Sequence, residues 1–241
     1  MLETRDEEKK IVYFYILDLT DPKVPVSQIP HEEEYWTGVE DFKDDYIILH
    51  GFAKPDMPAH KGIQVYSPVE KKVLWENEDA VFLFRKGESI YIFRQMFDSR
   101  EYLEYNITNG ALIAEHGEDH HHIKRIMSEA RDEEDFSMYG FPSQLSTDLN
   151  ILDEIPSFSG EKDNIINIEF LRYNGYILVS YHEKKGELFD NYLEIFKSGK
   201  MLDKIKLNSK TPRLIAESWF MYKNMLITIE DKSDLKIYKF E

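Results

Sequence analysis

A run of polar side chains between residues 116 and 122 contains the residue types that bind transition metals. Neutral imidazole nitrogens and carboxylate oxygens are ligands for zinc, nickel or copper. The run comprises His116, Glu118, Asp119, His120, His121 and His122. Adjacent histidines cannot easily all reach one ion, and the spacing does not match a His-Glu-x-x-His helix. We predict His116, His120 and His122 as candidate metal ligands, and the alternative is a solvated polar loop.

A second group of polar residues lies in the segment HGFAKPDMPAHKGIQVY, residues 50–66. Its two prolines stiffen the chain, and Gly51 and Gly62 permit tight backbone at its ends. A rigid loop that holds polar groups between two strands is a candidate binding surface. We predict His50, Asp56, His60 and Lys61 as ligand-binding residues. The alternative is a well-ordered connection that binds nothing.

Other motifs that carry chemistry are missing from the sequence. It contains no G-x-G-x-x-G fingerprint, no G-x-x-x-x-G-K-[ST] loop and no G-x-S-x-G elbow, so nucleotide binding and serine hydrolysis have no local support. Glycoside hydrolysis requires two carboxyl groups at a set separation across a cleft. Asp56, Asp190 and Glu217 are candidates for such a cleft. We predict no cofactor.

Composition narrows the class of protein further. The 241 residues carry a formal net charge of -16 and no cysteine. The charge disfavours a phosphate backbone as a general partner, and the missing cysteines exclude disulfides, iron-sulfur clusters and thiol nucleophiles. The first ten residues are strongly charged, and no apolar run approaches the length of a membrane span. We therefore expect a cytoplasmic protein that binds neither nucleic acid nor membrane.

The elements that must position these residues are mostly strands. Short runs rich in aromatic and β-branched residues end in turn signals, and several alternate between two faces, as antiparallel strands do. We predict strands at residues 11–17, 46–49, 62–66, 72–75, 80–84, 89–93, 102–107, 165–171, 176–181, 192–196, 225–230 and 235–240.

Two series of turns recur along the chain with a period of roughly 40–50 residues. One includes Lys86-Gly87-Glu88 and Asn174-Gly175, and the other includes Thr108-Asn109-Gly110 and Lys197-Ser198-Gly199. Four short strands in such a period are typical of a propeller blade. The sequence therefore predicts a single all-β, β-propeller-like domain over residues 1–241. Its five blades of four antiparallel strands would span 34–78, 79–118, 119–163, 164–210 and 211–241.

Two parts of the chain complete or interrupt this pattern. The last unit holds three strands, so we predict that the N-terminal strand 11–17 pairs into it and closes the ring. Within 119–163, Ile123, Ile126, Met127 and Ala130 recur at helical spacing, and Asp119 could cap a helix over about 120–133. If this unit decorates the ring, an open array of four sheets is the alternative, and a run of strands without a repeat is another.

The segment 50–66 and the repeat pattern together resemble an uncharacterised family of small bacterial proteins defined by a domain of unknown function. This resemblance implies no catalytic residue. Among the tryptophans, Trp36 follows a polar run and could lie exposed at a partner surface, whereas core packing is the alternative for Trp36, Trp75 and Trp219.

Two classes of function follow from these observations. In the first, a non-catalytic scaffold presents loops on one face of a propeller to a protein or small-molecule ligand. Its acidic residues, Glu32, Glu33, Glu34, Glu40, Asp41, Asp44 and Asp45, would then steer a basic partner. In the second, a hydrolase or lyase acts on a small molecule or sugar at the central channel, with carboxylates and His50 or His60 as acid and base. The missing catalytic motifs favour the scaffold.

Overall fold

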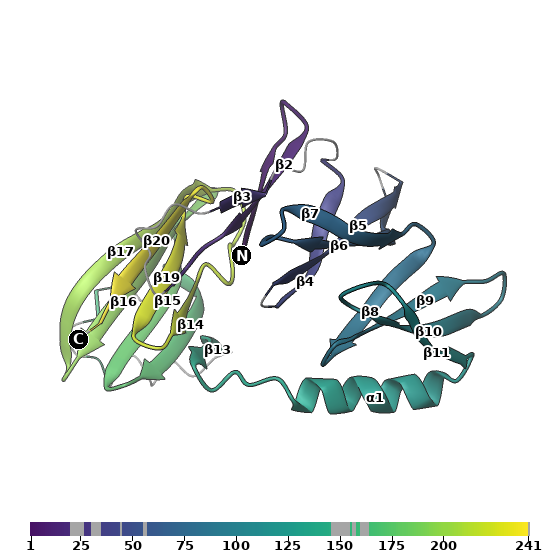
Figure 1. Cartoon of the computed structure of the whole chain (residues 1–241). Coiled ribbons are helices and arrows are strands. Elements are labelled where there is room, and N and C mark those ends of the chain that lie inside the picture. The colour runs from purple at the N-terminus through teal and green to yellow at the C-terminus, as the bar shows by residue number, and fades with distance from the viewer. Residues whose placement is uncertain are drawn as a thin grey trace. The chain divides into compact units, whose positions relative to one another are not determined.

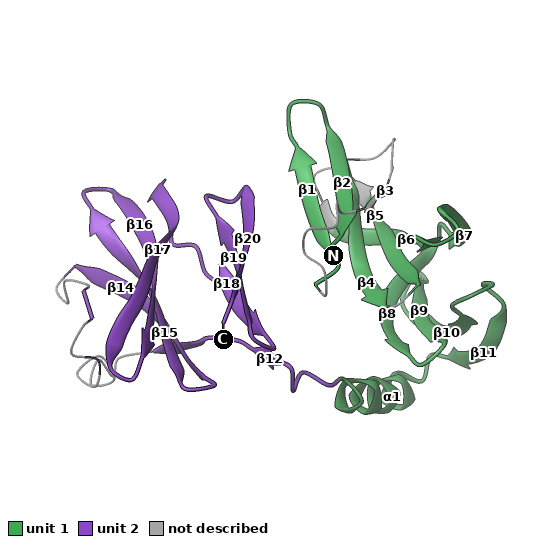
Figure 2. Cartoon of the chain, turned by 60° about the vertical axis from the view of Figure 1, so that its left-hand side comes forward, with its two compact units in different colours: residues 1–134 green, residues 135–241 purple. Residues whose placement is uncertain are grey.

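The chain forms two compact units, residues 1–134 and residues 135–241, which Figure 2 shows in green and purple. The computed structural model describes residues 1–19, 27–29, 35–43, 45–54, 57–145, 155, 158–159 and 164–240. In this part of the chain the fold is all-β, with five antiparallel sheets and one helix (Figure 1). The predicted fold class is thus confirmed at this level.

The first unit contains three of the sheets. The N-terminal sheet has the order β1-β2-β3, with β1 at Leu2–Asp6, β2 at Ile11–Ile16 and β3 at Ser27–Ile29. The second runs in chain order through β4 (Thr37–Lys43), β5 (Tyr46–Lys54), β6 (Met57–Ser67) and β7 (Lys72–Asn77). The third contains β8 (Ala80–Lys86), β9 (Ser89–Gln95), β10 (Arg100–Asn106) and β11 (Leu112–Gly117). These last two match the predicted units 34–78 and 79–118.

One helix, α1 (His120–Asp132), follows the third sheet. The Asp119 side chain accepts a hydrogen bond from the backbone N–H of His122, as an N-cap does. Ile123, Ile126 and Ala130 are buried on one face of the helix. The helix predicted from the apolar spacing is confirmed.

The second unit contains two sheets. One has five strands: β13 (Ser143–Leu145), β14 (Ile165–Tyr173), β15 (Tyr176–Lys185), β16 (Leu188–Lys197) and β17 (Lys200–Thr211). The other has the order β12-β18-β19-β20, with β12 at Tyr139–Gly140, β18 at Trp219–Tyr222, β19 at Met225–Glu230 and β20 at Asp234–Lys239.

Two-residue turns close several hairpins where the sequence places them. Tyr173 pairs with Tyr176 across Asn174-Gly175, whose φ angles are 47° and 79°. Lys197 pairs with Lys200 across Ser198-Gly199, whose φ angles are 51° and 75°. Positive φ at both central residues fits the right-handed twist of the flanking strands. These turns therefore set the register of the second unit.

One prediction about strand partners is wrong, and the stretch 119–163 departs from the predicted blade in the direction of its alternative. The N-terminal strand 11–17 does not close the last unit, because β2 pairs with β1 on one edge and β3 on the other. The fourth strand of the last sheet is β12 instead. The stretch 119–163 forms no blade in its described residues. It contributes α1 and then the short strands β12 and β13, which extend the two sheets of the second unit.

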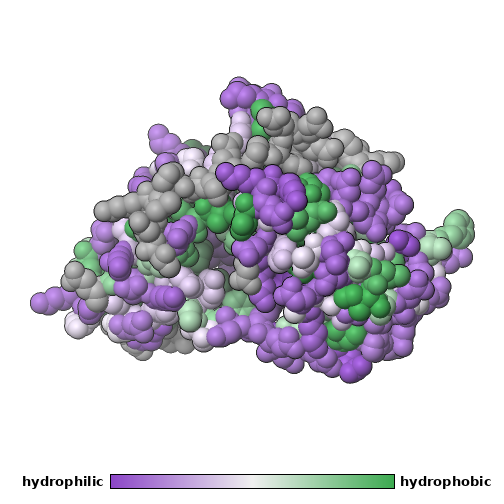
Figure 3. Space-filling model, viewed as in Figure 1, coloured by the Kyte–Doolittle hydropathy of each residue, from purple (hydrophilic) through white to green (hydrophobic). Residues whose placement is uncertain are grey.

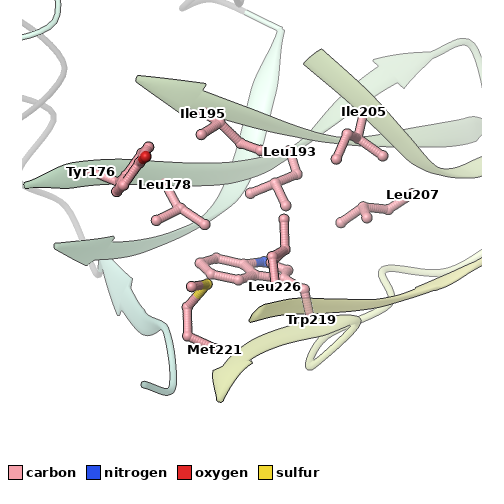
Figure 4. Packing of buried hydrophobic residues seen from close by; sticks show 9 residues of the cluster. All are labelled: Tyr176, Leu178, Leu193, Ile195, Ile205, Leu207, Trp219, Met221 and Leu226. Carbon is pink, nitrogen blue, oxygen red and sulfur yellow. The ribbon is translucent and has the colours of Figure 1, made fainter. Parts of the chain in front are cut away.

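Separate apolar clusters fill the two units. In the second unit, Trp219 packs against Leu193, Met221 and Leu226 between the two sheets, as Figure 4 shows. In the first unit, one cluster joins Ile48 and Val65 to Ile90 and Ile92 of the next sheet. Each of these clusters lies within one unit. The single domain over residues 1–241 stays a prediction.

The surface in Figure 3 is mostly hydrophilic, with small apolar patches. The described residues include no helix with the length and apolarity needed to span a bilayer.

Candidate metal centre

Two predicted ligand-binding histidines meet a carboxylate on the β4–β5–β6 sheet. Glu40, His50 and His60 each offer one ligand atom, and these atoms lie within 4.8 Å of one another. His60 Nδ1 lies 2.7 Å from Glu40 Oε1. The imidazole rings of His50 and His60 stack with centroids 3.6 Å apart and 19° between their planes. We call these three residues the Glu40 triad.

Two β-bulges bring the triad together. In the β4–β5 ladder Val39 pairs with Leu49 and Asp41 with Ile48, so Glu40 is the extra residue. In the β5–β6 ladder His50 pairs with Ile63 and Gly51 with Lys61, so Gly62 is the extra residue. Gly62 has a φ of 78°, which glycine adopts without a steric cost. Without these bulges the alternation of side chains would place the three groups differently.

Burial favours the neutral form of the His50 imidazole, and its contact with Gly51 sets the tautomer. His50 is buried, with 5% of its surface exposed. Nδ1 lies 3.0 Å from the carbonyl oxygen of Gly51, which can only accept, so Nδ1 carries the proton and Nε2 carries the lone pair. Burial lowers the pKa of His50, although the Gly51 carbonyl and the Glu40 charge oppose this effect. A neutral ring with a fixed tautomer is the form that ligates a metal.

Gly38 makes room for His50 on the paired strand. A Cβ at this position would lie 2.4 Å from His50 Nε2, and the two residues face each other in the ladder. Arg5 of β1 fixes the backbone just before Gly38, because its guanidinium donates hydrogen bonds to the carbonyl oxygens of Tyr35 and Thr37. The N-terminal sheet therefore supports the strand that carries Glu40.

A pocket of about 280 Å³ adjoins the triad. His50, Lys61, Glu76 and Glu78 are among its lining residues. The Lys61 ammonium also lies 3.4 Å from the Asp79 carboxylate. Three of the four predicted ligand-binding residues, His50, His60 and Lys61, thus lie together, whereas Asp56 lies outside the described residues. Glu40 was expected only as part of an acidic face, because a bulge gives no signal in the sequence.

Of the predicted ligands, His116 and His122 lie beside each other, whereas His120 contacts a different residue. His116 Nε2 lies 3.3 Å from Glu104 Oε2, and its ring centroid lies 5.2 Å from that of His122. His120 Nδ1 instead contacts the Tyr102 hydroxyl at 3.1 Å. Among the residues that the structure describes, the three histidines do not form a group of ligand atoms within 4.8 Å of one another.

The remaining candidates are dispersed. Asp190 is bound by Lys185 and Lys206, each with Nζ 3.1 Å from Oδ2, whereas Glu217 lies exposed beside a second pocket. Of the predicted acidic face, Asp41 pairs with Arg85, and 32–34 and 44 lie outside the described residues. Trp36 is 40% exposed, which matches one of its two expected placements, and Trp219 is 2% exposed.

The comparison with known families bears on the part of the chain that holds the triad. Residues 1–75 match the family described as "Domain of unknown function (DUF4905)". The resemblance to an uncharacterised family is therefore confirmed over the first two sheets, including the segment 50–66. No curated protein matches the chain.

Proposed function

We propose that this protein is a non-catalytic binding module whose Glu40 triad holds a divalent transition metal ion. The observation that carries this proposal is the approach of two imidazoles and one carboxylate to within 4.8 Å. Two histidines and a carboxylate are a known ligand set for Zn²⁺ and for non-haem iron. Ligand atoms around Zn²⁺ are roughly 3.3–3.5 Å apart, given bond lengths of about 2.0–2.2 Å. Because the imidazole planes of His50 and His60 are only 19° apart, at least one of the two rings must rotate for both nitrogens to reach one ion.

Zn²⁺ titration of the purified full chain tests this proposal. We expect one high-affinity site by isothermal titration calorimetry, and we expect His60→Ala to weaken it by at least roughly 100-fold, because the variant loses a ligand. His60 is exposed enough to be replaced without loss of the core. Binding should also weaken as the pH falls, because protons compete with the metal ion for the ligand nitrogens.

His122→Ala is the matched control, since it removes a histidine of the other predicted cluster. Unchanged Zn²⁺ affinity in this variant is the expected result. If His122→Ala abolishes binding and His60→Ala does not, the metal site lies at α1 and the Glu40 triad is wrong. If the unmodified protein has no tight Zn²⁺ site, neither the Glu40 triad nor the histidines near α1 form a metal site.

A hydrolase is the second candidate, and one observation favours it. His50 belongs to the triad and also lines the adjoining pocket. If Glu40, His50 and His60 hold a metal ion, that ion would have a position left for water and would supply the lowered water pKa that ester hydrolysis requires. Hydrolysis of a chromogenic ester by the Zn²⁺-loaded protein, lost in His60→Ala, would place this candidate first.

We also propose that the five sheets are blades of one β-propeller-like ring. Support comes from the succession of four-stranded antiparallel sheets over residues 37–77 and 80–117 and from the matching strand number in the last sheet. Single sheets of this kind bury both faces only by stacking on neighbours. In this arrangement the Glu40 triad would belong to the second blade.

A further inference from the structure

A second pocket lies wholly within the second unit and has no part in the Glu40 triad. Its volume is about 580 Å³, within the range of small-molecule sites. Its lining combines the aromatic residues Phe141, Trp219 and Phe220 with Gln144, Glu169 and Glu217. The chemistry of these groups indicates what the pocket would bind.

Glu169 brings a buried negative charge to the pocket. It is 7% exposed. The Trp219 indole donates to Ser180 Oγ at 2.9 Å, so the hydroxyl proton of Ser180 must point to Glu169 Oε2, 2.7 Å away. The backbone N–H of Glu217 donates to Oε1 at 3.4 Å. Both oxygens of Glu169 thus act as acceptors, as in an ionised carboxylate.

This carboxylate has no cationic partner in the described part of the chain. No salt bridge to Glu169 is formed there. His182 interacts with Glu169 electrostatically, but burial lowers the pKa of this imidazole and so favours its neutral form. A buried charge without a countercharge is costly, and a cation that entered the pocket would offset that cost. Glu217, which is exposed, adds a second negative charge in the lining.

The aromatic residues supply a surface suited to the same ligand. Phe141 is 55% exposed, and its ring centroid lies 6.0 Å from that of Phe220. Cations bind over aromatic faces within about 6 Å of the centroid. The indole of Trp219 is fixed by packing against Met221 and Leu226 (Figure 4). The Trp219 indole is 2% exposed and belongs to the core, so the accessible rings are those of Phe141 and Phe220. These two rings beside a buried carboxylate favour a cation with an apolar body.

Gln144 defines which cation fits best. Its Nε2 donates to Asn167 Oδ1 at 2.7 Å, so Oε1 is left as an acceptor for a ligand. A ligand with N–H donors can use this oxygen and the Glu169 carboxylate, whereas a quaternary ammonium group cannot. We propose that this pocket binds a small organic cation with a primary ammonium or guanidinium group, and that Glu169 is its charge partner.

Calorimetric titration of the full chain with n-butylammonium and n-butylguanidinium tests the proposal. We expect saturable binding of at least one of these probes, with 1-butanol and tetramethylammonium binding at least about tenfold more weakly, because they lack the charge or the N–H donors. No saturable binding of either probe, or equal binding of 1-butanol, would overturn the proposal.

Glu169→Gln and Glu187→Gln form a matched pair, since both remove one negative charge from the second unit and Glu187 lies exposed in the β15–β16 turn. We expect about a tenfold loss of affinity in Glu169→Gln and no change in Glu187→Gln. Equal losses would show attraction to the net charge alone. Should Glu169→Gln fail to fold, Phe141→Leu at an exposed position carries the test, and unchanged affinity there would contradict the proposed pocket.

Discussion

His50 and the residue opposite it show how one missing methyl group shapes a site. Gly38 pairs with His50, and no other residue fits there, because a Cβ would overlap the ring nitrogen. The φ angle of Gly38 is not in the left-handed region, so the requirement is space and not backbone conformation. Glycine at this position therefore serves the orientation of His50.

Gly38→Ala should displace the His50 ring and destabilise the protein by about 1–3 kcal/mol, the usual cost of overpacking. Urea unfolding monitored by circular dichroism measures this loss. Zn²⁺ affinity should fall in the same variant because Nε2 moves.

Gly51→Ala is the control for this substitution, since its added Cβ would lie 3.1 Å from the Lys61 carbonyl oxygen, a milder contact. We expect a smaller loss of stability. If the two variants are equally stable, close approach at Gly38 does not hold His50.

At the scale of the elements, Asp190 of β16 ties three strands together. Its carboxylate receives the backbone N–H of Lys210 at 2.8 Å and the ammonium groups of Lys185 on β15 and Lys206 on β17. The Lys210 hydrogen bond, assisted by the two ammonium groups and opposed by burial, holds the pKa of Asp190 well below its usual range. The Asp190 side chain is 7% exposed, whereas those of Lys185 and Lys206 are 53% and 44% exposed, so water screens the two ion pairs more than the backbone hydrogen bond.

The lowered pKa of Asp190 predicts how stability depends on pH. The unfolded chain has the ordinary value near 3.9 and binds the proton first, so this contribution is complete above about pH 5 and is lost as the pH falls toward the folded pKa. Asp190→Asn should lower the free energy of unfolding by roughly 1.5–3 kcal/mol at pH 7. The variant should also lose less stability than the unmodified protein as the pH falls below about 5. Urea unfolding from pH 2 to pH 7 measures both effects.

Asp203→Asn on β17 is the comparison for this prediction, because Asp203 is exposed. In this variant the free energy of unfolding should depend on pH in nearly the same way as in the unmodified protein. If the free energies of unfolding of Asp190→Asn and the unmodified protein change in parallel with pH, Asp190 does not make the proposed contribution to stability.

At the scale of the whole molecule, the two compact units raise the question of cooperativity. Their apolar clusters are separate, with Ile47 and Leu49 in the first unit and Leu193 and Ile195 in the second. If the five sheets form one ring, the blades at the junction between units must stabilise each other. Unfolding of one unit would then expose the faces of the other.

Hydrogen exchange in increasing urea, read by mass spectrometry, tests this arrangement. In a single ring, peptides that contain residues 47–49 and 193–195 should lose protection at the same urea concentration. Two well-separated transitions would instead show that the units are independent domains and would contradict the propeller-like ring.

The sequence by itself determined the features that depend on neighbouring residues. Alternation of side chains, turn pairs such as Asn174-Gly175 and the helical spacing after Asp119 act over a few residues, so strands, hairpins and α1 were predictable. The polar residues of the segment 50–66 were instead predicted in a loop between two strands, whereas His50 and His60 lie on β5 and β6, and the pairing of these strands brings them together. Only the tertiary structure decided the partners of β2, β12 and β13, since local periodicity carries no information about which edge a strand joins. The same holds for the bulge that turns Glu40 toward the histidines and for the long-range contact that brings Trp219 and Ser180 to Glu169.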